Sequence, residues 1–351
     1  MDRSQTAFTV VGVLAAGLVW APAASLAQPA EAEPWVLPRT SDGRPDLHGV
    51  WANNTATPLE RPESLGDQAV LTNEELARVK AHYAQLFAGG ESDAAFADSV
   101  FTAALGDQQT FSSRDAATGN YNQFWLVDRE FDHRTSLVVD PPTGRLPPLT
   151  PAAQRLTEAR AAHLAANPAS SWTDRRLQER CVTFGMPNLF AGYNSYYQIV
   201  QTPDHVVFVH EMIHDARIIP IGEAPHVDDA IRQWHGDARG YWDGDTLVVE
   251  TTNFSAQAES PAALYQRTRG SAEKLRLIER FTRVGPDTLE YDLTVDDPGT
   301  YAASWTAMIR LTRSDDPIFE YACHEGNIGM AGMLAGHRAE EREATGPPAA
   351  R

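Results

Sequence analysis

The chain has 351 residues, of which 42% are hydrophobic and 22% are charged. This composition is typical of a globular protein with a large core, and it excludes wholesale disorder. The 29 basic and 47 acidic residues give a net charge of −18, which disfavours binding to nucleic acid or anionic lipid because both are negatively charged. We therefore expect no nucleic-acid partner.

The N-terminus has the pattern of a secretory signal peptide. An apolar stretch over residues 9–20 follows Arg3, and it is too short to span a bilayer comfortably. Ser25-Leu26-Ala27 places small residues before Gln28, so the pattern predicts a signal peptide over residues 1–27, with an uncleaved anchor as the alternative. We expect a periplasmic or secreted protein with no transmembrane segment after cleavage.

The N-terminal half of the chain predicts helices joined by irregular segments. Thr72 and Glu75 have the spacing of a capping box, and Pro151 has the favoured first position of a second helix. The elements expected here are a proline-rich irregular segment over residues 28–70, a helix over 73–87, a loop or short helix over 89–120, strands over 124–127 and 136–139, and a helix from Pro151 to about Asn167.

The C-terminal half predicts antiparallel strands, because short β-branched segments recur about every 8–15 residues with turn residues between them. This pattern indicates a meander that closes into a barrel or folds as a sandwich. The expected strands cover residues 197–201, 206–209, 217–221, 246–251, 275–283, 288–295 and 305–312, with an edge strand over 319–322 and a helix over 330–341.

These elements predict a mainly β fold, an antiparallel barrel with helical decorations. We expect an extended and helical region over residues 28–190 that packs on the barrel. The barrel itself, with its C-terminal helix, is expected over residues 191–345.

The only two cysteines of the chain are Cys181 and Cys323. They exclude a disulfide framework and a cysteine-rich zinc site. In an exported protein, a pair of cysteines is more often a disulfide than two free thiols, because the compartment is oxidising. We expect a Cys181–Cys323 disulfide, and the alternative is a reactive thiol at Cys323 beside His324.

Two Gly-x-Trp triplets, Gly49-Val50-Trp51 and Gly240-Tyr241-Trp242, resemble the motif that opens the first strand of lipocalin-like (calycin) barrels. Longer runs over residues 211–220, 232–234, 240–254 and 320–327 resemble a family of largely uncharacterised exported bacterial proteins. The resemblance covers most of the mature chain. It implies export and a single lipocalin-like fold, and it implies no activity, cofactor or catalytic residue.

Residues 210–214 match the H-E-x-x-H motif of zinc metalloproteases. That chemistry needs a helix, because the i, i+4 spacing of a helix places both imidazoles on one face. The flanking residues are β-branched, and on a strand His210 and His214 would lie about 13 Å apart at roughly 3.3 Å per residue. A metallohydrolase of this type is therefore an alternative and not the main prediction.

A polar cluster interrupts the same apolar segment and contains Glu211, His214, Asp215 and Arg217. Buried charges are costly unless they are paired, so the cluster either faces water or is mutually satisfied around a cavity. We expect Asp215 to orient His214 and Glu211 to pair with Arg217, as in general acid–base catalysis. The alternative is a solvated hairpin turn with a surface ion pair.

A second polar cluster precedes the last helix. We interpret His324 and Glu325 as catalytic groups from the opposite wall of the site, and Asn327 as a ligand-binding group. The alternative is an exposed connection. If the two clusters meet, His214, His324 and Glu211 are candidate ligands for a divalent metal, although the spacing does not show that they meet.

Two further segments combine amide and aromatic side chains, which is typical of pockets for small organic ligands. The alternative is a barrel core with polar edges. The candidate ligand-binding residues are Tyr121, Asn122, Trp125, Tyr196 and Tyr197.

The main functional hypothesis is an exported enzyme, a lyase, isomerase or hydrolase, that acts on a small organic molecule by acid–base chemistry with or without a metal. The alternatives are a non-catalytic carrier of small molecules and an envelope interaction module. An enzyme is expected to bring titratable groups from distant segments to one point, whereas a carrier is expected to have an apolar cavity.

Overall fold

The computed structural model describes residues 35–89, 91–96, 98–112, 126–167, 171–186, 189, 191–259, 271–325 and 327–345. The expected signal peptide lies outside the described residues, as do Tyr121, Asn122 and Trp125 and part of the strand expected over 124–127. Residues from Val36 onward belong to one compact unit.

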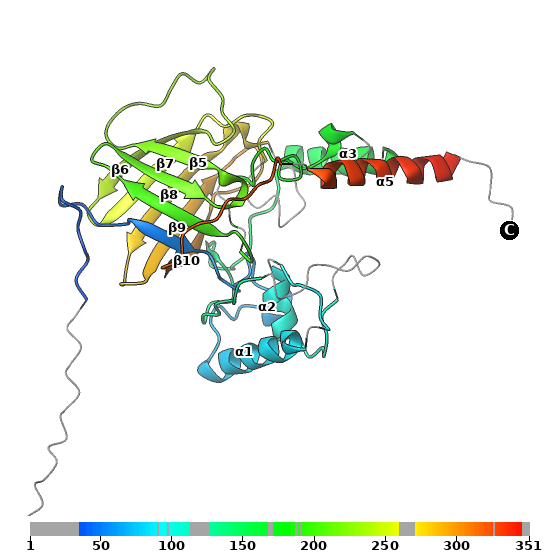
Figure 1. Ribbon diagram of the computed structural model, residues 1–351, viewed down its shortest axis with the longest axis horizontal. Coiled ribbons are helices and arrows are strands. Elements are labelled where there is room, and N and C mark those ends of the chain that lie inside the picture. Colours follow the sequence, from blue (N-terminus) through cyan, green and yellow to red (C-terminus); the bar gives the residue numbers. More distant parts are fainter. Residues whose placement is uncertain are drawn as a thin grey trace, which may run out of the picture. The chain divides into compact units, whose positions relative to one another are not determined.

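The helices expected from capping signals form where those signals lie. Helix α1 (Asn73–Ala88) follows Thr72, whose side chain accepts a hydrogen bond from the backbone of Glu75, while the Glu75 carboxylate accepts one from the backbone of Thr72. Helix α3 (Pro151–Ala166) has Thr150 as its N-cap. Helix α2 (Asp98–Leu105) packs beside α1, and helix α5 (Ile328–Thr345) ends the described chain (Figure 1).

Ten strands form one antiparallel sheet in the order β5-β4-β3-β1-β10-β9-β8-β7-β6, with β2 paired to β10 (Figure 1). Strand β1 comes from the N-terminal part of the chain and lies between β3 and β10. The strands are β1 (Gly49–Ala52), β2 (Val138–Asp140), β3 (Tyr196–Gln201), β4 (His205–His210), β5 (Ala216–Pro220), β6 (Asp237–Asp243), β7 (Thr246–Thr252), β8 (Arg276–Arg283), β9 (Thr288–Asp296) and β10 (Trp305–Ser314).

The two end strands of this sheet, β5 and β6, approach each other and close it into a barrel. A parallel bridge joins Ile221 to Gly240, and the Gly222 N–H donates to the Gly240 carbonyl at 2.9 Å. A Cβ atom at Gly240 would lie 2.6 Å from Cδ1 of Ile221, so a larger residue there would displace the Ile221 side chain at the closure. The expected mainly β, antiparallel barrel fold is confirmed.

The two Gly-x-Trp triplets have different roles in this barrel. Gly49-Val50-Trp51 forms the first strand, β1, where the Trp51 side chain is fully buried and donates to the Leu47 carbonyl. Gly240-Tyr241-Trp242 lies instead in β6, near the closure. Only the first triplet therefore opens the first strand.

Aromatic side chains from several strands occupy the middle of the barrel. Phe281 stacks on Tyr291 with ring centroids 4.4 Å apart and lies 4.7 Å from Phe208. All three side chains are buried and belong to one core cluster with Trp51 and Ile219. The interior at this level is packed with side chains, and inward-facing polar groups lie near the end where β4 leads to β5.

Two expectations about strands were wrong or incomplete. Residues 319–322 form no strand. Tyr321 and Cys323 pack instead against Met212 and Ile213 of the β4–β5 connection. Strand β6 was not predicted, since its sequence (DARGYWD) contains residues that are depleted in strands. Its antiparallel pairing with β7 stabilises it in spite of this low strand propensity.

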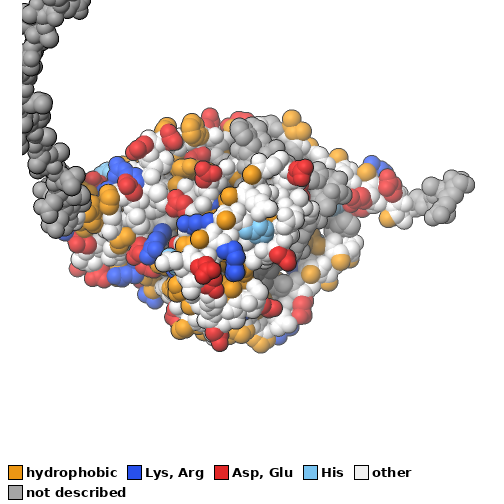
Figure 2. Space-filling view, turned by 90° about the horizontal axis from the view of Figure 1, so that it is seen from below, with side chains coloured by type: hydrophobic (Ala, Val, Ile, Leu, Met, Phe, Trp, Pro, Cys, Tyr) orange, Lys and Arg blue, Asp and Glu red, His pale blue; other side chains and the backbone are white. Residues whose placement is uncertain are grey.

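The outer surface carries charges of both signs. Figure 2 shows one face of the molecule, on which acidic, basic and hydrophobic side chains are interspersed. Outward-facing strand residues form exposed ion pairs such as Arg276–Glu250 and Arg310–Glu290, and each such pair contributes little to stability. Among the helices that the structure describes, none is long and apolar enough to cross a membrane.

Candidate functional site

The connection between β4 and β5 is a tight turn and not a helix of the H-E-x-x-H type. Met212–His214 form a single 3-10 turn in which Ile213 (φ 59°) and His214 (φ 47°) are both left-handed, which is rare for a β-branched residue. Burial of Met212 and Ile213 holds this conformation. His210 is buried whereas His214 is exposed, so the arrangement does not match that of a zinc metalloprotease.

The carboxylate that pairs with Arg217 is Glu279 on β8, and the expected pairing with Glu211 was wrong. The Arg217 guanidinium donates to both oxygens of Glu279, at 2.9 and 2.5 Å, and to the Thr251 hydroxyl at 3.2 Å. Arg217 faces the barrel interior because of its position in β5. Glu211 precedes the turn and accepts from the Asn194 amide at 2.5 Å.

The Arg217 guanidinium keeps its charge in this buried pair. Burial acts to lower the pKa of Arg217, but the Glu279 carboxylate outweighs it, so the pKa of Arg217 is raised. The Tyr291 hydroxyl donates to Glu279 at 2.7 Å and satisfies a further lone pair of the carboxylate. Both side chains of the pair are at most 4% exposed, so they interact with little screening by water.

The histidine that pairs with Asp215 is His235, which precedes β6, and the expected pairing with His214 was wrong. The Asp215 Oδ2 atom lies 3.3 Å from His235 Nε2. The Thr183 hydroxyl lies 2.9 Å from each of these two atoms. His214 turns away because its Nδ1 hydrogen-bonds to the Tyr321 carbonyl at 3.1 Å.

The hydrogen-bond network assigns the proton on His235. The Thr183 hydroxyl donates to Asp215, so it can only accept from His235 Nε2, and the Gly185 N–H also donates to it at 3.1 Å. Nε2 therefore carries a proton, and in the neutral imidazole Nδ1 carries the lone pair. The described residues offer no hydrogen bond to Nδ1. The imidazole is thus held like a general base with its free nitrogen available.

His210 lies in the barrel interior beside these groups. Its ring meets Tyr197 edge to face, with centroids 4.7 Å apart. Burial, assisted by the positive charge of Arg217, lowers the pKa of His210 to about 3, so the ring is neutral near pH 7. Within the part of the chain that the structure describes, His210 Nε2 and Arg217 Nε are buried without a hydrogen-bond partner.

A hollow of about 670 Å³ lies between β5 and the segment that leads into β6. It is lined by Val182, by Ala216, Arg217, Ile218 and Pro220 of β5, and by residues 232–239. His235 and Arg217 therefore face one space from opposite sides of the barrel closure. Gly236 has φ +68°, and a Cβ atom there would lie 2.4 Å from the Thr252 carbonyl, so glycine is required to place His235.

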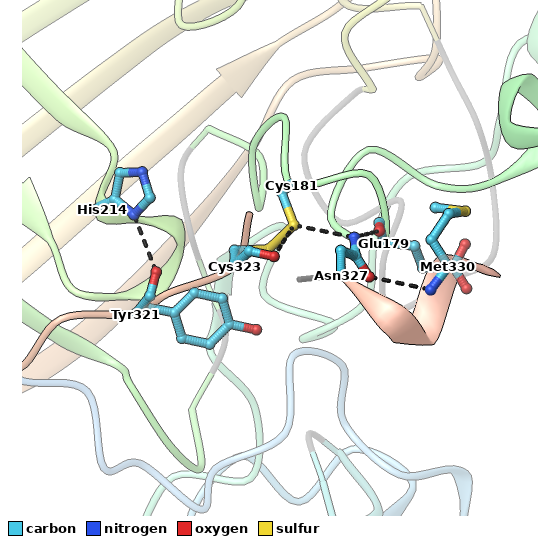
Figure 3. Close-up of a disulfide and its surroundings, with 7 residues drawn as sticks. All are labelled: Glu179, Cys181, His214, Tyr321, Cys323, Asn327 and Met330. Carbon is cyan, nitrogen blue, oxygen red and sulfur yellow. Dashed lines mark hydrogen bonds between the residues drawn. A yellow bond between two sulfur atoms is a disulfide. The ribbon is translucent and has the colours of Figure 1, made fainter. Parts of the chain in front are cut away.

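The second predicted cluster, which contains His324 and Glu325, lies near His214 and not at the hollow beside His235. The Cys181–Cys323 disulfide, with Cα atoms 5.7 Å apart, confirms the expected bridge and holds the segment of Tyr321 against the β4–β5 turn (Figure 3). His214 and His324 then lie with ring centroids 6.0 Å apart. Both are exposed, as is Glu325, so this pair lies in water rather than in a hollow.

The remaining predicted residues have structural contacts. Asn327 accepts a hydrogen bond from the Met330 backbone at the start of α5 and donates to the Glu179 carbonyl (Figure 3). Tyr197 packs on His210, and Tyr196 is half-buried. In the described part of the chain, no three His, Cys, Asp or Glu residues gather closely enough to hold a metal ion, and this includes His214, His324 and Glu211.

Four residues of this site were not predicted from the sequence, and two of them had a signal. Glu279 has the same parity as Leu277 and Phe281 in an alternating strand, which places it on the buried face. His235 follows the Arg232-Gln233-Trp234 run directly. Thr183 and Tyr291 carried no comparable signal.

Comparisons with known proteins add little to this picture. No protein-family model and no curated protein matches the chain. A solved structure of a secretary abundant heat soluble (SAHS) protein from Ramazzottius varieornatus is similar, with 14% sequence identity and a TM-score of 0.22, over 34% of this chain and 70% of that chain. A likeness of this size carries no argument, so the fold assignment rests on the strand pairing.

Proposed function

We propose that this chain is an acid–base enzyme, a lyase, isomerase or hydrolase, that acts on a small polar organic molecule in the hollow between β5 and β6. The observation that carries the proposal is the meeting of Thr183, Asp215 and His235, from three segments far apart in the sequence, beside Arg217. Convergence of this kind is the criterion that separates an enzyme from a carrier.

Each group has a role that follows from its contacts. His235 takes a proton from the substrate, or from water, through Nδ1. The Thr183 hydroxyl accepts from Nε2–H, and the Asp215 carboxylate, 3.3 Å from Nε2, stabilises the imidazolium that forms. The Arg217 charge, held by Glu279, favours negative charge that develops on the substrate in the hollow.

The packing of the barrel supports an enzyme over a carrier of apolar molecules. A carrier needs an apolar interior volume. Here Phe208, Phe281 and Tyr291 occupy the middle of the barrel and contact one another. The hollow that contains the titratable groups lies at the barrel closure instead.

We also propose that the protein acts in the periplasm or outside the cell. The Cys181–Cys323 disulfide supports this location, because such bonds persist in oxidising compartments. Cell fractionation of a producing bacterium, with mass measurement of the N-terminus, tests it. An intact N-terminus in the cytoplasmic fraction would contradict the proposal.

A screen for proton transfer tests the activity and does not require a chosen substrate. The full chain is incubated in D₂O with an extract of small polar metabolites, and conversion or deuterium incorporation is followed by NMR and mass spectrometry. We expect a turned-over compound whose rate falls about 10²–10⁴-fold in His235→Gln and does not change in His205→Gln, an exposed histidine at the start of β4.

Three results would overturn the proposal. The first is the absence of any converted compound. The second is full activity in both His235→Gln and Asp215→Asn. The third is a loss of activity in His214→Gln alone, which would place the chemistry at the exposed His214–His324 pair instead.

A further inference from the structure

A second hollow, of about 470 Å³, lies between α3 and residues 256–259. Its lining includes three arginines, Arg160, Arg175 and Arg180, and a single acidic residue, Glu259. This is a basic site on a chain whose net charge is −18. A local excess of arginine in an acidic protein favours an anionic ligand.

The Arg175 side chain is nearly buried and only partly satisfied, and its one hydrogen bond to the described residues is from Nη1 to the Met333 Sδ atom at 3.6 Å. It is only 10% exposed, and its Nε and Nη2 atoms are buried with no hydrogen-bond partner from the described residues. The nearest carboxylate oxygen, on Glu179, is 3.8 Å from Nη1, which is too long for a hydrogen bond. Glu179 instead accepts from the backbone of Arg176 at 2.8 Å. A nearly buried guanidinium in this state is costly without a further anion.

Arg180 and Arg160 complete the basic wall in different ways. The Arg180 guanidinium lies over the Trp172 ring, 4.8 Å from its centroid, and it makes no ion pair with the acidic residues that the structure describes. Arg160 is already neutralised, since it contacts the Asp174 side chain at 3.3 Å and the Asp174 carbonyl at 2.8 Å. Arg180 therefore has no carboxylate partner among the described residues, and Arg175 has only the long Glu179 contact of 3.8 Å, so both can bind an anionic ligand.

Flat apolar surface adjoins these charges. Trp172 is 57% exposed, and both Trp172 and Trp234 line the hollow with Leu156 and Leu177. An exposed indole next to a cavity suits the stacking of an aromatic ring. A volume of this size suits a small organic molecule.

We propose that this hollow binds a small aromatic carboxylate, with its carboxylate on Arg175 and Arg180 and its ring against the tryptophans. A guanidinium is a planar fork of donors that matches a carboxylate. This site goes beyond the proposed function and is independent of it, because it contains neither His235 nor Asp215. Trp234 lines both hollows, so a ligand here would neighbour the candidate active site.

Isothermal titration calorimetry on the full chain tests the proposal with 1-naphthoate as the probe. The comparison compounds are 1-naphthalenemethanol, which has the ring without the charge, and acetate, which has the charge without the ring. We expect 1-naphthoate to bind at least about tenfold more tightly than either compound, because only it uses both the arginines and the tryptophans.

Variants locate the binding. Arg180→Ala, Arg175→Gln and Trp172→Ala should each weaken 1-naphthoate about tenfold or more. Arg310→Ala is the matched control, because it removes an exposed arginine that is paired on the outer face of the sheet. Trp172 is exposed, and Arg180 contacts its ring, so substitution of either residue should not disturb the core. These two variants therefore remain informative if Arg175→Gln fails to fold.

Equal affinity for 1-naphthoate and 1-naphthalenemethanol would overturn the proposal, as would the absence of binding. The same loss in Arg310→Ala as in Arg180→Ala would also overturn it, because it would reveal a general charge effect. Binding is read without turnover, so a failure here is distinct from a failure of the proposed enzyme activity.

Discussion

The buried pair Arg217–Glu279 makes the strongest quantitative prediction. Glu279→Gln keeps the shape of the side chain and one acceptor oxygen but removes its charge, and it leaves the Arg217 guanidinium uncompensated in the barrel. Removal of one partner from a buried ion pair costs roughly 3–5 kcal/mol. The hydrogen bonds that glutamine can still form recover about 1 kcal/mol, so we expect a net loss near 3 kcal/mol.

Removal of both charges should cost less than removal of either one. In the double variant Arg217→Met, Glu279→Leu, no buried charge remains, and the main losses are the partners of the Tyr291 and Thr251 hydroxyls. We expect the double variant to be at least about 2 kcal/mol more stable than Glu279→Gln. In Arg217→Met alone, Glu279 is a lone buried carboxylate, so this variant should become less stable as the pH rises.

The assay is equilibrium urea denaturation followed by circular dichroism, with the disulfide intact. Glu290→Gln is the control, since it removes an outward-facing carboxylate paired with Arg310 and should cost at most about 1 kcal/mol. A loss in Glu279→Gln that equals the control would refute the reasoning. So would a double variant Arg217→Met, Glu279→Leu that is no more stable than Glu279→Gln, because it would mean that the uncompensated charge is not what destabilises the single variant.

Three further predictions concern other parts of the chain. Burial raises the pKa of Asp98 to about 6, so the folded state keeps this proton to a higher pH than the unfolded state, and the free energy of unfolding falls as the pH rises from about 4 to 6. The variant Asp98→Asn keeps an acceptor for the Leu59 N–H and should increase the free energy of unfolding by up to about 3 kcal/mol at pH 7 and by nothing at pH 4. An equal increase at both pH values in urea denaturation would be evidence against this account. His214 has a left-handed φ of 47°, so His214→Gly should be about 1 kcal/mol more stable than His214→Ala. At the exposed strand residue Ile218, which serves as the control, Ile218→Ala should instead be more stable than Ile218→Gly. The same order of stability at both positions in thermal denaturation would contradict the left-handed conformation of His214. The disulfide joins residues separated by 142 positions, so Cys181→Ser with Cys323→Ser should lose about 5 kcal/mol on the chain-entropy model, and a loss below about 1 kcal/mol would show that the bridge constrains the unfolded chain very little.

The sequence alone determined the features that depend on neighbours along the chain. The start of α1 was predictable because Thr72 and Glu75 cap the same turn. The strands β8 to β10 were predictable because their side chains alternate between a buried and an outward face. The disulfide was predictable because the chain has only two cysteines and the expected compartment is oxidising.

The tertiary structure alone decided which polar groups meet. Arg217 and Glu279 are 62 positions apart, and Asp215 and His235 lie on opposite sides of the barrel closure. Proximity along the chain suggested Glu211 and His214 as partners, but the left-handed turn at Ile213 sends these two side chains elsewhere. Capping and alternation act over a few residues, whereas charge pairing depends on how the sheet closes, and that is set by the burial of the whole core.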